Sequence, residues 1–142
     1  MTGATGVTRP EQVERRRVAW VDTDAGGRIH FTAAFRWAEA AEHDLVVGFA
    51  LPGIDIADFP RRHVEAEYRG VLRFDDEIEV RLRAERVGRT SITYAWRILR
   101  GGELCIVGRH TVVHVDGAGR AAPVPDGLRA ALRGAPVSLD GR

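Results

Sequence analysis

Residues 20–31 of this 142-residue chain read Trp20-Val21-Asp22-Thr23-Asp24-Ala25-Gly26-Gly27-Arg28-Ile29-His30-Phe31. The stretch leads from an apolar segment, through two acidic residues and two glycines, to a helix-forming run that begins near Thr32. At the start of a helix the backbone N–H groups are unpaired and the helix dipole favours negative charge. The sequence therefore places a carboxylate beside a flexible turn and a site suited to an anion.

Two interpretations of Asp22 and Asp24 remain open on spacing alone. Aspartate before glycine is ordinary turn and capping chemistry, so both residues can be structural. A base and an oxyanion site within a few residues of each other are, alternatively, what acyl transfer requires.

The rest of the chain shows one long helical pattern and several strand patterns. Residues 32–50 are apolar on most sides, with Arg36, Glu39, His43 and Asp44 on a narrow polar stripe, which predicts a helix wrapped by other structure. Strands are expected over 13–22, 62–70, 76–87, 90–99 and 104–115, and a short helix with Asp126 as its N-cap over 126–133. This order predicts a single α+β domain over 13–134, with an antiparallel sheet of about five strands round one central helix. Residues 1–12 and 135–142 are expected to be flexible.

Composition excludes several classes of function. The net charge is +1, so no global basic field recruits nucleic acid. No apolar run approaches the ~20 residues of a membrane span, and the N-terminus does not resemble a signal peptide. Cys105 is the only cysteine and lies in an apolar run, which indicates a buried thiol in a reducing cytoplasm.

The sequence gives little support for a histidine metal site or a serine hydrolase. His110 and His114 lie four residues apart in a strand pattern and would be ~13 Å apart, too far to share a metal ion. His63 is expected at the surface. Neither Ser91 nor Ser138 has the glycine-rich elbow of a serine hydrolase.

An ordered set of motifs spans about residues 14–133. An Asp-x-Asp pair with glycines at 22–27 is followed by apolar and aromatic residues at 29–31 and by a helical aromatic-x-acidic stretch at 36–41. Further motifs lie at 64–68, 74–80, 88–94 and 124–125. Together they resemble the hotdog-fold thioesterases, specifically the 4-hydroxybenzoyl-CoA thioesterase-like group of small acyl-CoA thioesterases.

This resemblance implies a mechanism. Asp24 would attack the thioester carbonyl or activate water to do so, and the backbone N–H of Phe31 would hold the carbonyl oxygen at the helix start. Gly27 would let the substrate approach closely. His30 is a further catalytic candidate, although many relatives have an aromatic residue and then a histidine where this chain has His30 and Phe31. The family mechanism needs no metal and no bound cofactor, because coenzyme A or an acyl carrier arm arrives with the substrate.

The resemblance also implies residues that bind substrate. Arg28 stands where relatives usually have an apolar residue. Glu39 either orients the site or pairs with an arginine. Arg89, Thr90 and Ser91 lie at a hairpin that is close to the active site in the family, where the neighbouring subunit helps to build it. The plain alternative for Arg89 is an arginine on an exposed turn.

The predicted fold leaves one sheet face and the strand edges open, so we expect a homodimer or homotetramer. The expected function is hydrolysis of an acyl-CoA or acyl-carrier-protein thioester in the cytoplasm. Ala33 and Ala34 replace polar or aromatic residues of relatives; they could widen an acyl pocket, or indicate a non-catalytic acyl-thioester binder. A hotdog-fold hydratase or dehydratase is a further alternative, although its motif is not found.

Overall fold

The computed structural model describes residues 9–134. Of the segments expected to be flexible, 1–12 and 135–142, only residues 9–12 are described, and Glu11 and Gln12 begin the first strand instead. The strands are β1 Glu11–Arg17, β2 Arg61–Tyr68, β3 Glu77–Val87, β4 Ser91–Arg100 and β5 Glu103–Val113. The helices are α1 Ala33–Gly48 and α2 Asp126–Leu132, with short 3-10 turns η1 Trp20–Asp22 and η2 Ile56–Asp58.

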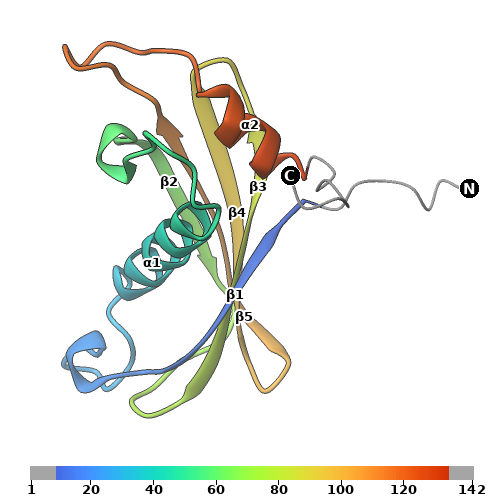
Figure 1. Ribbon diagram of the computed structural model, residues 1–142. Helices are drawn as coiled ribbons and strands as arrows, with labels where there is room; N and C mark the ends of the chain where they lie inside the picture. Colours follow the sequence, from blue (N-terminus) through green and yellow to red (C-terminus); the bar gives the residue numbers. More distant parts are fainter. Residues whose placement is uncertain (1–8, 135–142) are drawn as a thin grey trace, which may run out of the picture.

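The five strands form one antiparallel sheet in the order β1-β3-β4-β5-β2. Alternate residues of β3 and β4 are buried, as expected for a sheet with one covered face. Figure 1 shows α1 lying against one face of this sheet and α2 at the end where β3 meets β4. The prediction of an α+β domain with one long and one short helix is confirmed.

The core fills the space between α1 and the covered sheet face. Trp96 is its largest fully buried side chain, and its ring lies over Gly108 in the neighbouring strand. Phe35 of α1 meets Trp96 edge-on, with ring centroids 5.8 Å apart. The alanines Ala33 and Ala34 are also fully buried, so they pack in the core and do not widen a surface pocket.

A buried polar network joins α1 to β5. Nε1–H of Trp96 can only donate, so Nδ1 of His110 accepts its hydrogen bond at 3.1 Å. The proton of His110 therefore sits on Nε2, which donates to Glu42 Oε1 at 2.8 Å. The same carboxylate oxygen lies 2.6 Å from Nη1 of Arg61, at the start of β2. The network supplies partners for a carboxylate that α1 carries into the core.

The expected element boundaries differ from the observed ones mainly near the site. The strand predicted over 13–22 begins at Glu11 and ends at Arg17, and its last part is the 3-10 turn η1. The turn forms because the Asp22 carboxylate accepts the N–H of Ala19, which draws the chain out of the extended conformation. At α2, Pro125 holds the N-cap position and Asp126 is the first helical residue.

Candidate functional site

The segment between η1 and α1 folds into a small antiparallel turn. The backbone of Thr23 bridges to Ile29, and the N–H of Asp24 donates to the carbonyl of Arg28 at 2.8 Å. Gly27 closes the turn by donating to the carbonyl of Asp24 at 3.0 Å. Gly27 has φ +78°, a left-handed backbone conformation that residues other than glycine rarely adopt. The glycine therefore shapes the turn that presents Asp24.

The two aspartates of the motif have different environments. Asp22 is buried, accepts the Ala19 amide at 2.9 Å and lies 3.1 Å from Nη1 of Arg36 in the first turn of α1. Asp24 is exposed, and its Oδ1 accepts the N–H of Gly26 at 2.8 Å. Its other carboxylate oxygen has no hydrogen-bond partner within residues 9–134. Both aspartates thus make local turn contacts, as the structural interpretation expects, and Asp24 in addition keeps a free carboxylate oxygen.

The backbone just before α1 is arranged round Phe31. The N–H of His30 donates to the carbonyl of Asp22 at 2.7 Å, and the N–H of Ala33 donates to the carbonyl of His30 at 2.9 Å. Between them, the N–H of Phe31 donates to no acceptor in the described part of the chain. The hydroxyl of Tyr68 in β2 donates to the carbonyl of Phe31 and fixes the peptide on its other side. An unpaired amide therefore lies at the positive end of α1.

His30 is held by its local partners. Its Nδ1 accepts the N–H of Thr32 at 3.2 Å and lies 2.7 Å from the Thr32 hydroxyl. Its ring stacks on that of Phe31, with centroids 4.7 Å apart. The side chain is exposed, and its Nε2 is the nitrogen left for a ligand.

Glu39 and the 89–91 hairpin lie away from this turn. Glu39 is exposed on α1 and forms an ion pair of 3.2 Å with Arg61. Pairing with an arginine was one of the two roles expected for it. The hairpin follows the end of β3, whereas the Asp24 turn lies beside the loop before β3, where Arg28 bridges to Arg73. At about 3.3 Å per residue, β3 places these two ends roughly 30 Å apart. Within one protomer the hairpin and Asp24 therefore do not meet.

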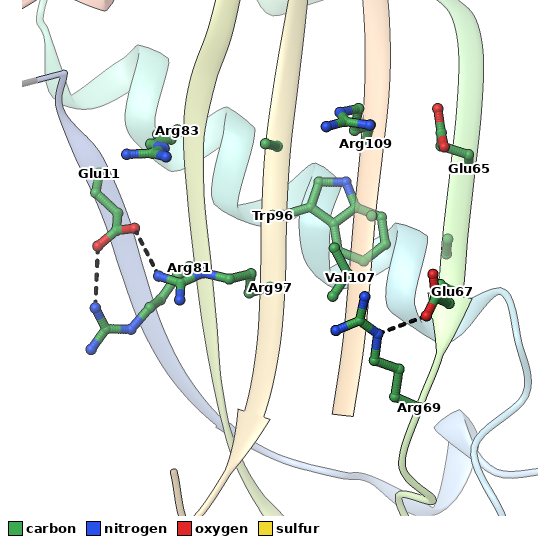
Figure 2. Close-up of a pocket in the computed structure, with 13 residues that line it drawn as sticks. Glu11, Glu65, Glu67, Arg69, Arg81, Arg83, Trp96, Arg97, Val107 and Arg109 are labelled. Atoms are coloured by element: carbon green, nitrogen blue, oxygen red, sulfur yellow. Dashed lines mark hydrogen bonds and ion pairs between the residues drawn. The ribbon is translucent and has the colours of Figure 1, made fainter. Parts of the chain in front are cut away.

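Three cavities found within the described residues lie elsewhere, and two of them bear on the site. One of about 720 Å³ runs along the polar stripe of α1, between Arg36, Arg61 and Phe59. Another of about 580 Å³ lies on the sheet face away from α1, and Figure 2 shows its charged lining. Neither cavity is lined by Asp24, which stands open on the protomer surface.

The remaining candidates have structural environments. Cys105 and His110 are buried, and burial raises the pKa of the Cys105 thiol. His63 is exposed, as predicted. His114 packs on Phe59 and lies 2.9 Å from the carbonyl of Pro123. Among residues 9–134 no group of three or more potential metal ligands gathers. In that part of the chain no helix has the length and apolar character needed to cross a bilayer.

Comparison with known proteins identifies the family of this chain. The family model described as the Thioesterase-like superfamily matches residues 18–132. A 1,4-dihydroxy-2-naphthoyl-CoA hydrolase from Synechococcus sp. (strain CC9605) is 29% identical over 125 residues, covering 80% of this chain and 83% of the relative. The enzyme of the same name from Prochlorococcus marinus (strain NATL2A) is 32% identical over 115 residues, 72% of each chain.

A solved structure of a similar protein has the same fold. The structure of a predicted thioesterase from Bacillus stearothermophilus superposes with a TM-score of 0.78 at 26% identity, covering 87% of this chain and 95% of the other. The arrangement of five antiparallel strands and a long helix is thus that of the hotdog thioesterases. The match over 115 of the 142 residues decides the assignment: this chain belongs to the Thioesterase-like superfamily.

Proposed function

We propose that this protein hydrolyses the thioester of an acyl-CoA or acyl-carrier substrate at Asp24. The chain is a thioester hydrolase. The choice of Asp24 as the reacting residue rests on one observation. A carboxylate with one free oxygen lies a short turn away from the unpaired N–H of Phe31 at the start of α1. A carboxylate and a backbone donor are the two groups that acyl transfer requires.

The proposed chemistry follows one of two routes. Asp24 either attacks the carbonyl carbon, expels the thiolate and forms an anhydride that water then opens, or takes a proton from the water that attacks. In both routes negative charge develops on the carbonyl oxygen, and the Phe31 amide with the dipole of α1 would stabilise it. The departing thiolate takes a proton from solvent. Neither route uses a metal or a bound cofactor.

The relatives suggest where to look for the substrate. The two curated proteins are named as hydrolases of 1,4-dihydroxy-2-naphthoyl-CoA, an aromatic thioester of coenzyme A. We therefore propose a CoA thioester in the first place, with an aromatic acyl group as one candidate. CoA chemistry and the single, buried Cys105 fit a cytoplasmic location.

The proposed site is completed by a second copy. Strand β2 pairs only with β5 and forms one edge of the sheet, with Val64 and Tyr68 exposed. Two such edges can pair antiparallel about a two-fold axis. The Tyr68 end of β2 lies at the Phe31 peptide, whereas its Arg61 end lies beside the end of β5 that reaches Thr90. Antiparallel pairing would therefore bring the partner's hairpin end toward Asp24.

This geometry gives the hairpin a role in substrate binding. Arg89, Thr90 and Ser91 of one copy would face the Asp24 turn of the other, and Arg89 could bind phosphates of coenzyme A as a bidentate donor. Arg28 and His30 would lie on the Asp24 side of the same cleft. The proposed active form is a homodimer or a pair of homodimers.

The decisive experiment measures thiol release from aryl-, short-chain and long-chain acyl-CoAs by the wild type and by Asp24→Asn. We expect hydrolysis of at least one class and a loss of ~100-fold or more in the variant. Equal rates in the two proteins would place the chemistry elsewhere. Tight binding without thiol release would favour an acyl-thioester binder.

A further inference from the structure

The sheet face away from α1 carries charged side chains in rows. One row crosses the sheet as Glu11, Arg83, Ala95, Arg109 and Glu65, according to the strand register. Ala95 is the only member of the row with a short side chain. Its methyl group lies between Arg83 and Arg109 on the neighbouring strands, and all three residues line the 580 Å³ cavity. We call the space over Ala95 the gap.

A second row makes the middle of this face more basic. Arg81 and Arg97 stand directly opposite each other in β3 and β4, an arrangement of like charges that is normally destabilising. Glu11 reaches both of them, at 3.3 Å and 3.7 Å, and Figure 2 shows it at the rim of the cavity. Five arginines line the cavity against three glutamates, so carboxylates of the lining do not balance its positive charge.

The arginines that line the cavity differ in the number of carboxylate partners they have. Arg81 pairs with Glu79 at 2.6 Å, and Arg109 forms two hydrogen bonds to Glu85 at 2.8 and 3.0 Å. These contacts raise the pKa of both guanidinium groups.

Arg83 differs, because in the described part of the chain its side chain has no hydrogen-bond or ion-pair partner. Arg97 has only the 3.7 Å contact to Glu11. Arg83, opposite Ala95, and Arg97, two residues further along the same strand as Ala95, thus line the cavity with few partners of their own.

We propose that this gap is a binding site for a small anion carrying two or more phosphate groups, held by Arg83 and Arg97. The planar guanidinium group of arginine can donate two parallel hydrogen bonds to one phosphate group. Arginines that only face solvent leave these donors without a protein or ligand acceptor. The cavity volume lies within the range of small-molecule sites, ~300–1,000 Å³. Because the sheet separates this face from α1 and Asp24, the site does not depend on the proposed hydrolysis.

Calorimetric titration with inorganic pyrophosphate at low ionic strength tests the proposal, since salt screens exposed charges. We expect the wild type to bind, and the double variant Arg83→Gln with Arg97→Gln to bind about 10-fold more weakly or worse. Ala95→Gln should weaken binding as well, because it fills the gap without changing charge. Arg120→Gln, an exposed arginine on a distant turn, is the matched control and should bind like the wild type.

Several outcomes would overturn the site. They are no binding by the wild type, unchanged binding by the double variant or by Ala95→Gln, and an equal loss in Arg120→Gln, which would reflect net charge alone. A face covered by a second copy in solution would give the first outcome.

The phosphate groups could belong to a free polyphosphate or to the nucleotide end of coenzyme A. Titration with adenosine 3′,5′-bisphosphate distinguishes them, because tighter binding than that of pyrophosphate indicates the nucleotide end, and weaker binding indicates a free polyphosphate.

Discussion

Asp22 and Arg36 form an ion pair of 3.1 Å that ties the turn before Asp24 to the first turn of α1. The Asp22 carboxylate is buried, whereas about half of the Arg36 side chain is exposed. The first aspartate of the motif is therefore an anchor, and the second is the residue that we propose to face the substrate.

This division of roles predicts different effects on stability for two matched substitutions. Asp22→Asn should lower the free energy of unfolding by about 1–3 kcal/mol, because a buried charged hydrogen-bond partner is lost. Asp24→Asn should leave the free energy of unfolding close to that of the wild type, since the side chain is exposed. Urea denaturation measures both. Wild-type stability in Asp22→Asn, combined with lost hydrolysis, would place Asp22 in the chemistry instead.

The buried Glu42 predicts a large loss of stability. Glu42→Ala would leave the Nε2–H of His110 without its acceptor and remove the 2.6 Å partner of Arg61. We expect a loss of about 3–5 kcal/mol in the free energy of unfolding, as when one member of a buried ion pair is removed. Denaturant titration followed by tryptophan fluorescence is suitable, because Trp96 belongs to the same network.

Glu39→Ala is the control for this prediction. Glu39 pairs with the same arginine from the exposed side of α1, and pairs of this kind contribute about 0–1 kcal/mol. Equal losses in the two variants would show that the buried network does not stabilise the fold more than a surface pair does.

Two glycines without left-handed backbone provide a test of packing. A Cβ at Gly108 would lie inside van der Waals contact of the Trp96 ring, whereas a Cβ at Gly48 meets nothing within 4 Å. Gly108→Ala should therefore destabilise by about 1–3 kcal/mol through overpacking. Gly48→Ala, in the last turn of α1, should be neutral or stabilise by up to ~1 kcal/mol. Thermal unfolding compares the two, and a stable Gly108→Ala would mean that the Trp96 ring can shift freely.

The parts of the fold that could be predicted are those that leave a local pattern in the sequence. Alternating burial in β3 and β4 and the apolar run of α1 follow from side-chain periodicity, which depends only on near neighbours in the chain. The turn η1 was missed because it depends on one long-range ion pair, Asp22 with Arg36, and on a side-chain bond to the Ala19 amide. Neither contact leaves a periodic signal.

The candidate site shows the same limit. Asp24, Gly27 and Phe31 could be named because they are close in sequence and match a family motif. Tyr68, whose hydroxyl reaches the Phe31 carbonyl from β2, carries no local signal of that contact. The burial of Glu42 was also missed, because its partner His110 lies 68 residues away.

Gly27 provides the last prediction, on the shape of the turn itself. A Cβ there meets nothing within 4 Å, so within the protein itself the cost of Gly27→Ala comes from the φ of +78°. Alanine is strained in this region by about 1–2 kcal/mol, whereas asparagine tolerates it. If the turn must hold Asp24 in place, Gly27→Ala should lower kcat/KM for the thioester by about 10-fold, and Gly27→Asn should retain most of the activity.

Steady-state thiol release measures this, with Gly48→Ala as a glycine control remote from the turn. Equal losses in the alanine and asparagine variants would mean that any side chain at 27 obstructs the substrate, so that close approach and not backbone conformation is what requires glycine. Unchanged activity in both would mean that the turn tolerates other conformations, and Asp24 would then owe its position to the Asp22–Arg36 anchor alone.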